Sequence, residues 1–172
     1  GLIFPMLKII FWGEKFGRMK KSTYIAEKLK VMTTTNGVYL LIDNELRQVK
    51  DYNNEPDARV AVVYQGTVVV IPPKNFGEAD YYNAMKIAEA NGMKLGNKPD
   101  WAIVDLLLKE VNEALELLGH DIINGAYWTC NEYSSYYAWF YNSVGSLLNF
   151  SKNLSIYVRL LSSFPLDALN TK

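Results

Sequence analysis

The chain has one cysteine and one histidine among its 172 residues, Cys130 and His120. A single cysteine cannot form an intrachain disulfide, which argues against the disulfide-stapled folds of small secreted proteins. A single histidine does not allow the usual zinc ligand sets to be assembled. No apolar run approaches the roughly 20 residues that a membrane-spanning helix needs, so we expect no membrane span.

The chain also lacks a net charge. Lysine plus arginine and aspartate plus glutamate both number 18, so the formal charge at neutral pH is zero. Proteins that bind nucleic acids usually carry a clear basic excess, and we therefore expect no nucleic-acid partner. Zero net charge leaves little repulsion between copies of the chain, which keeps formation of a homo-oligomer open.

Residues 1–36 are interpreted as an N-terminal arm, followed by one domain at 37–165 and a tail at 166–172. The segment 2–12 is apolar but short, carries Lys8, and lacks both a leading basic region and a small-residue cleavage pattern. No signal peptide is therefore recognised, and the arm is predicted to pack on the domain or to mediate association. Ser22 has the residue type of an N-cap for a short helix within this arm.

Two β-hairpins are predicted between residues 38 and 71. The runs 38–42 and 45–49 are separated by Asp43-Asn44, and the run 59–71 is divided at Gln65-Gly66. β-branched residues are frequent in these runs, and both dividing pairs suit tight hairpin turns.

From Glu78 the apolar period changes from two to about 3.6. One helix is predicted over 78–91 with Gly92 just beyond its end, and a second from Pro99 to about Leu118. After Gly125 the pattern returns to short strands. Because strands and helices are segregated along the chain, the predicted fold class is α+β.

The segment 126–159 is unusually aromatic. It contains ten aromatic residues among serines and asparagines, and only Glu132, Lys152 and Arg159 are charged. Tyrosine and tryptophan provide contact area at low entropic cost, while serine and asparagine provide adaptable hydrogen bonds. This composition is typical of a surface that binds a ligand rather than of a catalytic cleft.

The order of residues in this segment also follows a family pattern. The matching positions are Tyr127-Trp128-Thr129, Glu132-Tyr133-Ser134-Ser135, Ala138-Trp139, Gly145, Lys152 and Tyr157-Val158-Arg159. They resemble the C-terminal signature of C-type-lectin-like domains of bacteria and phages, including the variable proteins of diversity-generating retroelements. The resemblance extends over roughly 22–163 and implies a C-type-lectin-like fold with β-hairpins, two helices and a β-rich C-terminal lobe that binds the ligand.

The resemblance further implies which residues are scaffold and which face a ligand. Trp128, Trp139, Gly145, Tyr157, Val158 and Arg159 match scaffold positions, and Arg159 is expected to pair with Glu132 or to bind backbone carbonyls. The expected ligand-binding residues match variable positions of the family, with packing of Phe140 and Leu148 in a core as the alternative. They are Asn131, Tyr136, Tyr137, Phe140, Asn142, Ser146, Leu148, Asn149, Asn153 and Ser155.

A protein or glycan on a cell surface is the expected partner, and the chain itself is expected on a bacterial surface or a phage particle. The chain lacks the tripeptides and clustered carboxylates of calcium-dependent sugar binding, so no metal and no cofactor are expected. Two other functions remain open. The aromatic face could be an oligomer interface of a structural module, or the fold could be that of an enzyme related to formylglycine-generating enzymes, although these use a cysteine pair.

Other candidate residues favour structural roles. His120 follows Gly119 at a helix end and is interpreted as a surface or capping residue. Cys130 could act as a nucleophile only with a base beside it. His120 is close in the sequence but has no other support in that role, so Cys130 is interpreted as an inert thiol. The acidic row Glu110, Glu113 and Glu116 is interpreted as a solvated helix face.

Overall fold

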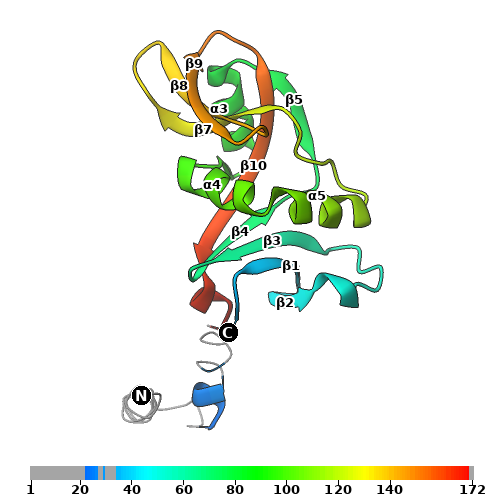
Figure 1. The fold of residues 1–172 in the computed structure, drawn as a ribbon. Coiled ribbons are helices and arrows are strands. Elements are labelled where there is room, and N and C mark those ends of the chain that lie inside the picture. The colour runs from blue at the N-terminus through cyan, green and yellow to red at the C-terminus, as the bar shows by residue number, and fades with distance from the viewer. Residues whose placement is uncertain (1–21, 27–28, 30–33, 171–172) are drawn as a thin grey trace.

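The computed structural model describes residues 22–26, 29 and 34–170. Two groups of strands lie one above the other, and the long strand β10 (Ile156–Pro165) runs through both (Figure 1). Within the described residues the strands form one mixed sheet of ten, and α-helices lie beside it. The predicted α+β class is therefore confirmed. The predicted helix after Ser22 lies only partly within the described residues, and segment 2–12 lies outside them.

The lower group consists of two hairpins, β1 (Gly37–Ile42) with β2 (Glu45–Gln48) and β3 (Arg59–Tyr64) with β4 (Thr67–Ile71). Asp43 and Asn44 both have positive φ, as do Gln65 and Gly66. Two consecutive positive φ values are the signature of the hairpin turn whose twist matches that of the strands. Both predicted hairpins are confirmed.

The middle of the chain contains the helices, and two predicted boundaries are wrong. Glu78 lies in β5 (Asn75–Ala79), opposite Tyr157 of β10, so α3 (Tyr81–Ala90) starts later, after its N-cap Asp80. The predicted second helix is interrupted at Leu107, whose φ of −127° is not helical, and consists of α4 (Lys98–Leu106) and α5 (Leu108–Leu117). Pro99 lies in the first turn of α4, and Gly92 has positive φ after α3, as predicted.

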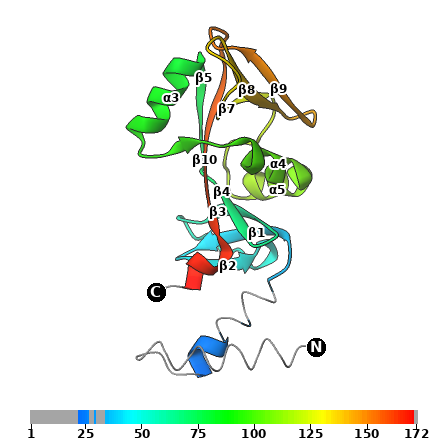
Figure 2. The same ribbon diagram turned by 90° about the vertical axis from the view of Figure 1, so that its left-hand side faces the viewer.

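The predicted β-rich C-terminal part is confirmed. After the two-residue strand β6 (Lys94–Leu95), β7 (Ala126–Glu132), β8 (Tyr137–Asn142), β9 (Ser146–Ser151) and β10 follow. β10 pairs with β4 in the lower group and with β5, β6 and β7 above it, so it joins both groups (Figures 1 and 2). Part of the predicted tail, Leu166–Asn170, is a 3-10 helix whose Leu166 is buried beside Tyr39.

The core consists of three clusters of buried side chains. The largest lies around Trp101 and joins α4 and α5 to the lower hairpins, while a second joins α3 to β7 and β8 around Trp128. The third covers the other side of the lower hairpins. β8 therefore contributes to two clusters, Tyr141 to the first and Phe140 to the second.

Candidate functional site

Two loops and the start of α3 meet at one end of the upper strand group, and we call this region the tip. It comprises residues 133–137, which follow β7 and include the first residue of β8, residues 152–155 between β9 and β10, and Tyr82 of α3. Lys152 N donates to Tyr136 O at 2.8 Å, and Tyr81 N donates to Lys152 O at 3.0 Å. Backbone hydrogen bonds therefore connect all three segments.

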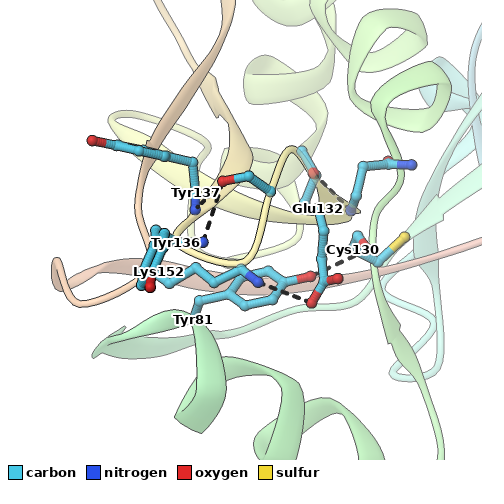
Figure 3. Close-up of polar contacts among 9 residues, drawn as sticks. Tyr81, Cys130, Glu132, Tyr136, Tyr137 and Lys152 are labelled. Atoms are coloured by element: carbon cyan, nitrogen blue, oxygen red, sulfur yellow. Dashed lines mark hydrogen bonds and ion pairs between the residues drawn. The ribbon is translucent and has the colours of Figure 1, made fainter.

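The loop 133–137 is held in one conformation by the hydroxyl of Ser134. Its Oγ accepts hydrogen bonds from Tyr136 N at 3.2 Å and Tyr137 N at 3.1 Å (Figure 3). Tyr137 O in turn accepts from Tyr133 N and Ser134 N. A surface loop whose backbone is ordered in this way loses less conformational entropy when a ligand binds.

The large apolar and aromatic side chains of the tip face solvent. Tyr136 is 78% exposed, and Tyr133 and Tyr137 of the same loop are also exposed. Tyr82 of α3 and Leu154 of the loop 152–155 are exposed beside them. The Tyr133 ring lies edge-on against the half-buried Trp139, at 5.7 Å between ring centroids. Exposed tyrosines gathered on ordered backbone are the arrangement that antibody paratopes use to bind proteins.

The buried side chain of Lys152 stabilises the tip. Its side chain is 5% exposed, and its Nζ lies 3.1 Å from Oε1 of Glu132, which is 63% exposed (Figure 3). The ammonium also lies 5.4 Å from the centroid of the Tyr81 ring. A buried ammonium is costly unless it is paired, so these contacts compensate for its removal from water.

Tyr81 lies between the tip and the core and contacts both. Its ring packs edge-on against Trp128 at 5.4 Å, and its hydroxyl donates to Cys130 O at 3.3 Å. Burial, with smaller contributions from Glu132 and Cys130, raises the pKa of Tyr81 to about 12. Tyr81 therefore remains a neutral hydrogen-bond donor at physiological pH.

The structure distributes the predicted ligand-binding residues over several places. Tyr136, Tyr137, Asn153 and Ser155 are exposed at the tip, as expected. Leu148 and Asn149 are exposed on β9, which is not part of the tip. The half-buried Asn142 and Ser146 lie opposite each other at the far end of the β8–β9 hairpin.

The other two predicted residues do not face solvent as expected. Phe140 is 3% exposed and packs in the cluster around Trp128, so its expected exposure is wrong and the core alternative holds for it. The reason is that β8 has core on both faces, so alternation along the strand does not separate inside from outside. Asn131 is half-buried, and its Oδ1 accepts from Lys98 N at 2.8 Å, at the start of α4.

Sequence reasoning missed Tyr82 and Leu154, and treated Tyr133 only as a family position. Asp80 as an N-cap would have placed Tyr81 and Tyr82 at a helix start. No local pattern, however, indicates that this helix start lies beside Lys152. Of the two alternatives expected for Arg159, binding of backbone carbonyls is confirmed, since it donates to Pro72 O and Asp121 O, whereas Glu132 pairs with Lys152.

Cys130 and His120, the residues weighed as nucleophile and base, lie in different environments in this fold. Burial, followed by the charge of Asp100, raises the pKa of the Cys130 thiol, which disfavours the reactive thiolate. Burial and two arginines, Arg59 and Arg159, lower the pKa of His120. The charged neighbours of the two residues thus differ.

A cavity of about 370 Å³ lies beside Cys130 and is also lined by Lys94 and Asp100. Asp100 serves the start of α4, because its Oδ2 accepts from Asn97 N at 3.0 Å. Within the described residues, no three histidine, cysteine or acidic side chains are grouped to hold a metal. The acidic row Glu110, Glu113 and Glu116 is exposed on α5, as interpreted.

A scan of protein-family models and a search of curated proteins return no match to this chain. Among the described residues, no helix combines the length and apolar character needed to cross a membrane.

Proposed function

We propose that this chain is a non-catalytic ligand-binding module, of the receptor-binding or adhesin kind, that contacts a macromolecule through the tip. The observation that carries the proposal is the group of exposed tyrosines, Tyr133, Tyr136 and Tyr137, on a loop ordered by Ser134. Large rings on preordered backbone gain contact area without a large entropic cost, which favours binding of a protein or glycan surface.

The fold proposed for this module is C-type-lectin-like. Its support is the order of elements, in which two hairpins precede the helices and a β-rich part with the tip follows. Gly145 has positive φ in the β8–β9 turn, and Trp128 and Val158 are fully buried. This burial and this turn conformation support the scaffold roles that the resemblance implies for these residues.

We further propose that a diversity-generating retroelement varies the exposed residues of the tip. Tyr136, Tyr137, Asn153 and Ser155 are exposed, so we expect their exchange to leave the core packing intact. The genomic locus tests this idea, since a downstream near-copy of the coding region that differs only at adenines should accompany a reverse transcriptase. Codon differences that avoid these four positions would contradict it.

Binding of the full chain to an array of purified surface proteins and glycans tests the proposed function itself. The double variant Tyr136→Ala, Tyr137→Ala is expected to weaken any binding that the array detects by about tenfold or more, because exposed aromatic anchors dominate such interfaces. Val144→Ala is the matched control, since Val144 is exposed on the β8–β9 turn outside the tip. Unchanged affinity of a folded double variant would overturn the proposal.

A further inference from the structure

β9 (Ser146–Ser151) is the terminal strand at one end of the sheet. In the described part of the chain the strand order is β2-β1-β3-β4-β10-β7-β8-β9, so β9 is paired on one side only, with β8. It lies at the outer side of the upper strand group (Figure 2). The backbone of such a strand carries donors and acceptors that another strand can pair with.

The other terminal strand, β2 (Glu45–Gln48), is protected against such pairing. It is short and carries Glu45 and Arg47, and the Arg47 guanidinium lies 3.3 Å from Glu55. Charges on an edge strand are the usual means by which proteins prevent edge-to-edge association. β9 has the sequence SLLNFS and contains no charge, proline or glycine. It therefore lacks the sequence features that keep an edge unpaired.

The β8–β9 register determines on which face of the sheet each β9 side chain lies. Leu148 lies opposite Phe140 and Phe150 lies opposite Ala138, so both project from the face that contains the Trp128 cluster. They remain 50% and 43% exposed at the margin of this cluster. Asn149, opposite Trp139, projects from the other face. The edge thus presents two incompletely covered apolar side chains with an amide between them.

We propose that β9 pairs with β9 of a second copy of this chain, antiparallel and across a two-fold axis at Asn149. Opposite residues in an antiparallel pair share a face, so a two-fold axis perpendicular to the sheet must place one residue opposite its own copy. With Asn149 on the axis, Leu148 lies opposite the partner subunit's Phe150, and Phe150 lies opposite the partner subunit's Leu148. Both exposed apolar residues are then covered in each subunit.

Charge favours a second copy as the occupant. The strand is neutral, and the chain as a whole has zero net charge, so two copies meet without repulsion. Lys152, which directly follows β9, is buried and paired with Glu132 of its own subunit. No unpaired charge is therefore brought against its copy near the axis. The pairing also closes this edge, since each β9 satisfies the other and no free β9 edge remains in the dimer.

Sedimentation velocity of the full chain over a concentration series tests the pairing. We expect a monomer–dimer equilibrium, and we expect Leu148→Lys to raise the dimer dissociation constant by about tenfold or more, because it places a charge on the edge. The matched control is Leu117→Lys, since Leu117 is an exposed leucine on α5 that lines a pocket with Gly37 and Val38 of β1 in the lower group. Unfolding curves of both variants verify that each is folded.

Thiol crosslinking tests the register without disturbing the apolar residues. In a Cys130→Ser background, Asn149→Cys is expected to give a covalent dimer with a short bis-maleimide, whereas Val144→Cys on the β8–β9 turn is not. A full chain that stays monomeric at all concentrations would overturn the proposal and leave the edge for an extended segment of another protein. A dimer that Leu148→Lys leaves intact and that Asn149→Cys does not crosslink would also overturn it.

Discussion

The tyrosines of the C-terminal part belong to two populations with opposite environments. Tyr127 and Tyr141 are 1% exposed and stack on either side of Trp101, with ring centroids 5.1 and 4.9 Å from it. Tyr133 and Tyr136 are exposed at the tip only a few residues away in the sequence. The same residue type thus builds the core and the proposed binding surface.

The hydroxyl groups show what separates the two populations. Tyr141 donates to Asp105 Oδ1 at 2.6 Å, and Tyr127 Oη accepts from Asn124 N at 2.9 Å. Within the described residues the hydroxyls of Tyr133, Tyr136 and Tyr137 have no protein partner. A buried polar group has to be paired inside the protein, whereas an exposed one can exchange water for a ligand. The exposed hydroxyls are therefore available for recognition.

Arg159 is the extreme member of the buried polar group, and its removal should have the largest effect. The fully buried guanidinium donates to Pro72 O, Asp121 O and Asn75 Oδ1 at 2.8 to 3.2 Å. Arg159→Met leaves these acceptors unpaired and should lower the free energy of unfolding by about 3 kcal/mol or more. Urea denaturation measures this loss.

Arg47→Met is the control for the arginine prediction. The Arg47–Glu55 pair lies at the surface, and such pairs contribute at most about 1 kcal/mol. A loss from Arg159→Met as small as that from Arg47→Met would contradict the assignment of Arg159 as the polar centre of the fold.

Alkaline pH should lower the free energy of unfolding through the buried tyrosines. Burial raises the pKa of Tyr81 to about 12 and also raises the pKa values of Tyr127 and Tyr141, mainly by desolvation. In the unfolded chain tyrosine loses its proton near pH 10, as a rough reference value. The unfolded state then binds fewer protons than the folded state, so the free energy of unfolding falls as pH rises above that value.

The measured quantity is the slope of the free energy of unfolding against pH. Each buried tyrosine contributes up to about 1.4 kcal/mol per pH unit between its unfolded and folded pKa values. Urea midpoints recorded from neutral to strongly alkaline pH should stay constant at first and then decline. In Tyr81→Phe the decline should be shallower, and an unchanged slope would contradict the raised pKa of Tyr81.

The regular elements were predictable because their signals are local. The turn pairs Asp43-Asn44 and Gln65-Gly66, the proline in α4 and Gly92 after α3 all act within a few residues, and each has the predicted role. The break at Leu107 was not predicted, since the apolar period continues through it. Both helices pack in the cluster around Trp101, α4 against β7 and β8 and α5 against β1 and β3, and this tertiary packing overrides the local pattern there.

The tip was predicted only in part, because its composition is local but its assembly is not. The exposure of Tyr136 and Tyr137 was expected, because both match variable positions of the family pattern in an aromatic and polar segment. Phe140 was not separated from them, since only the packing of α3 on β8 decides that its ring is buried. Tyr82 was missed because the hydrogen bond from Tyr81 N to Lys152 O joins segments that lie far apart in the sequence.

A pair of hydroxyl deletions gives the smallest and most direct test of the comparison. Tyr141→Phe removes the donor to Asp105 Oδ1 and leaves a carboxylate oxygen without its partner, so the free energy of unfolding should fall by about 1 to 2 kcal/mol. Tyr136→Phe removes an exposed hydroxyl with no protein partner, so its effect should stay within about 0.5 kcal/mol. Urea denaturation of both variants under the same conditions measures the difference. Equal losses would mean that the two populations are not distinguished by their hydroxyl partners, whereas the expected difference would allow weaker ligand binding by Tyr136→Phe to be assigned to the contact surface rather than to the fold.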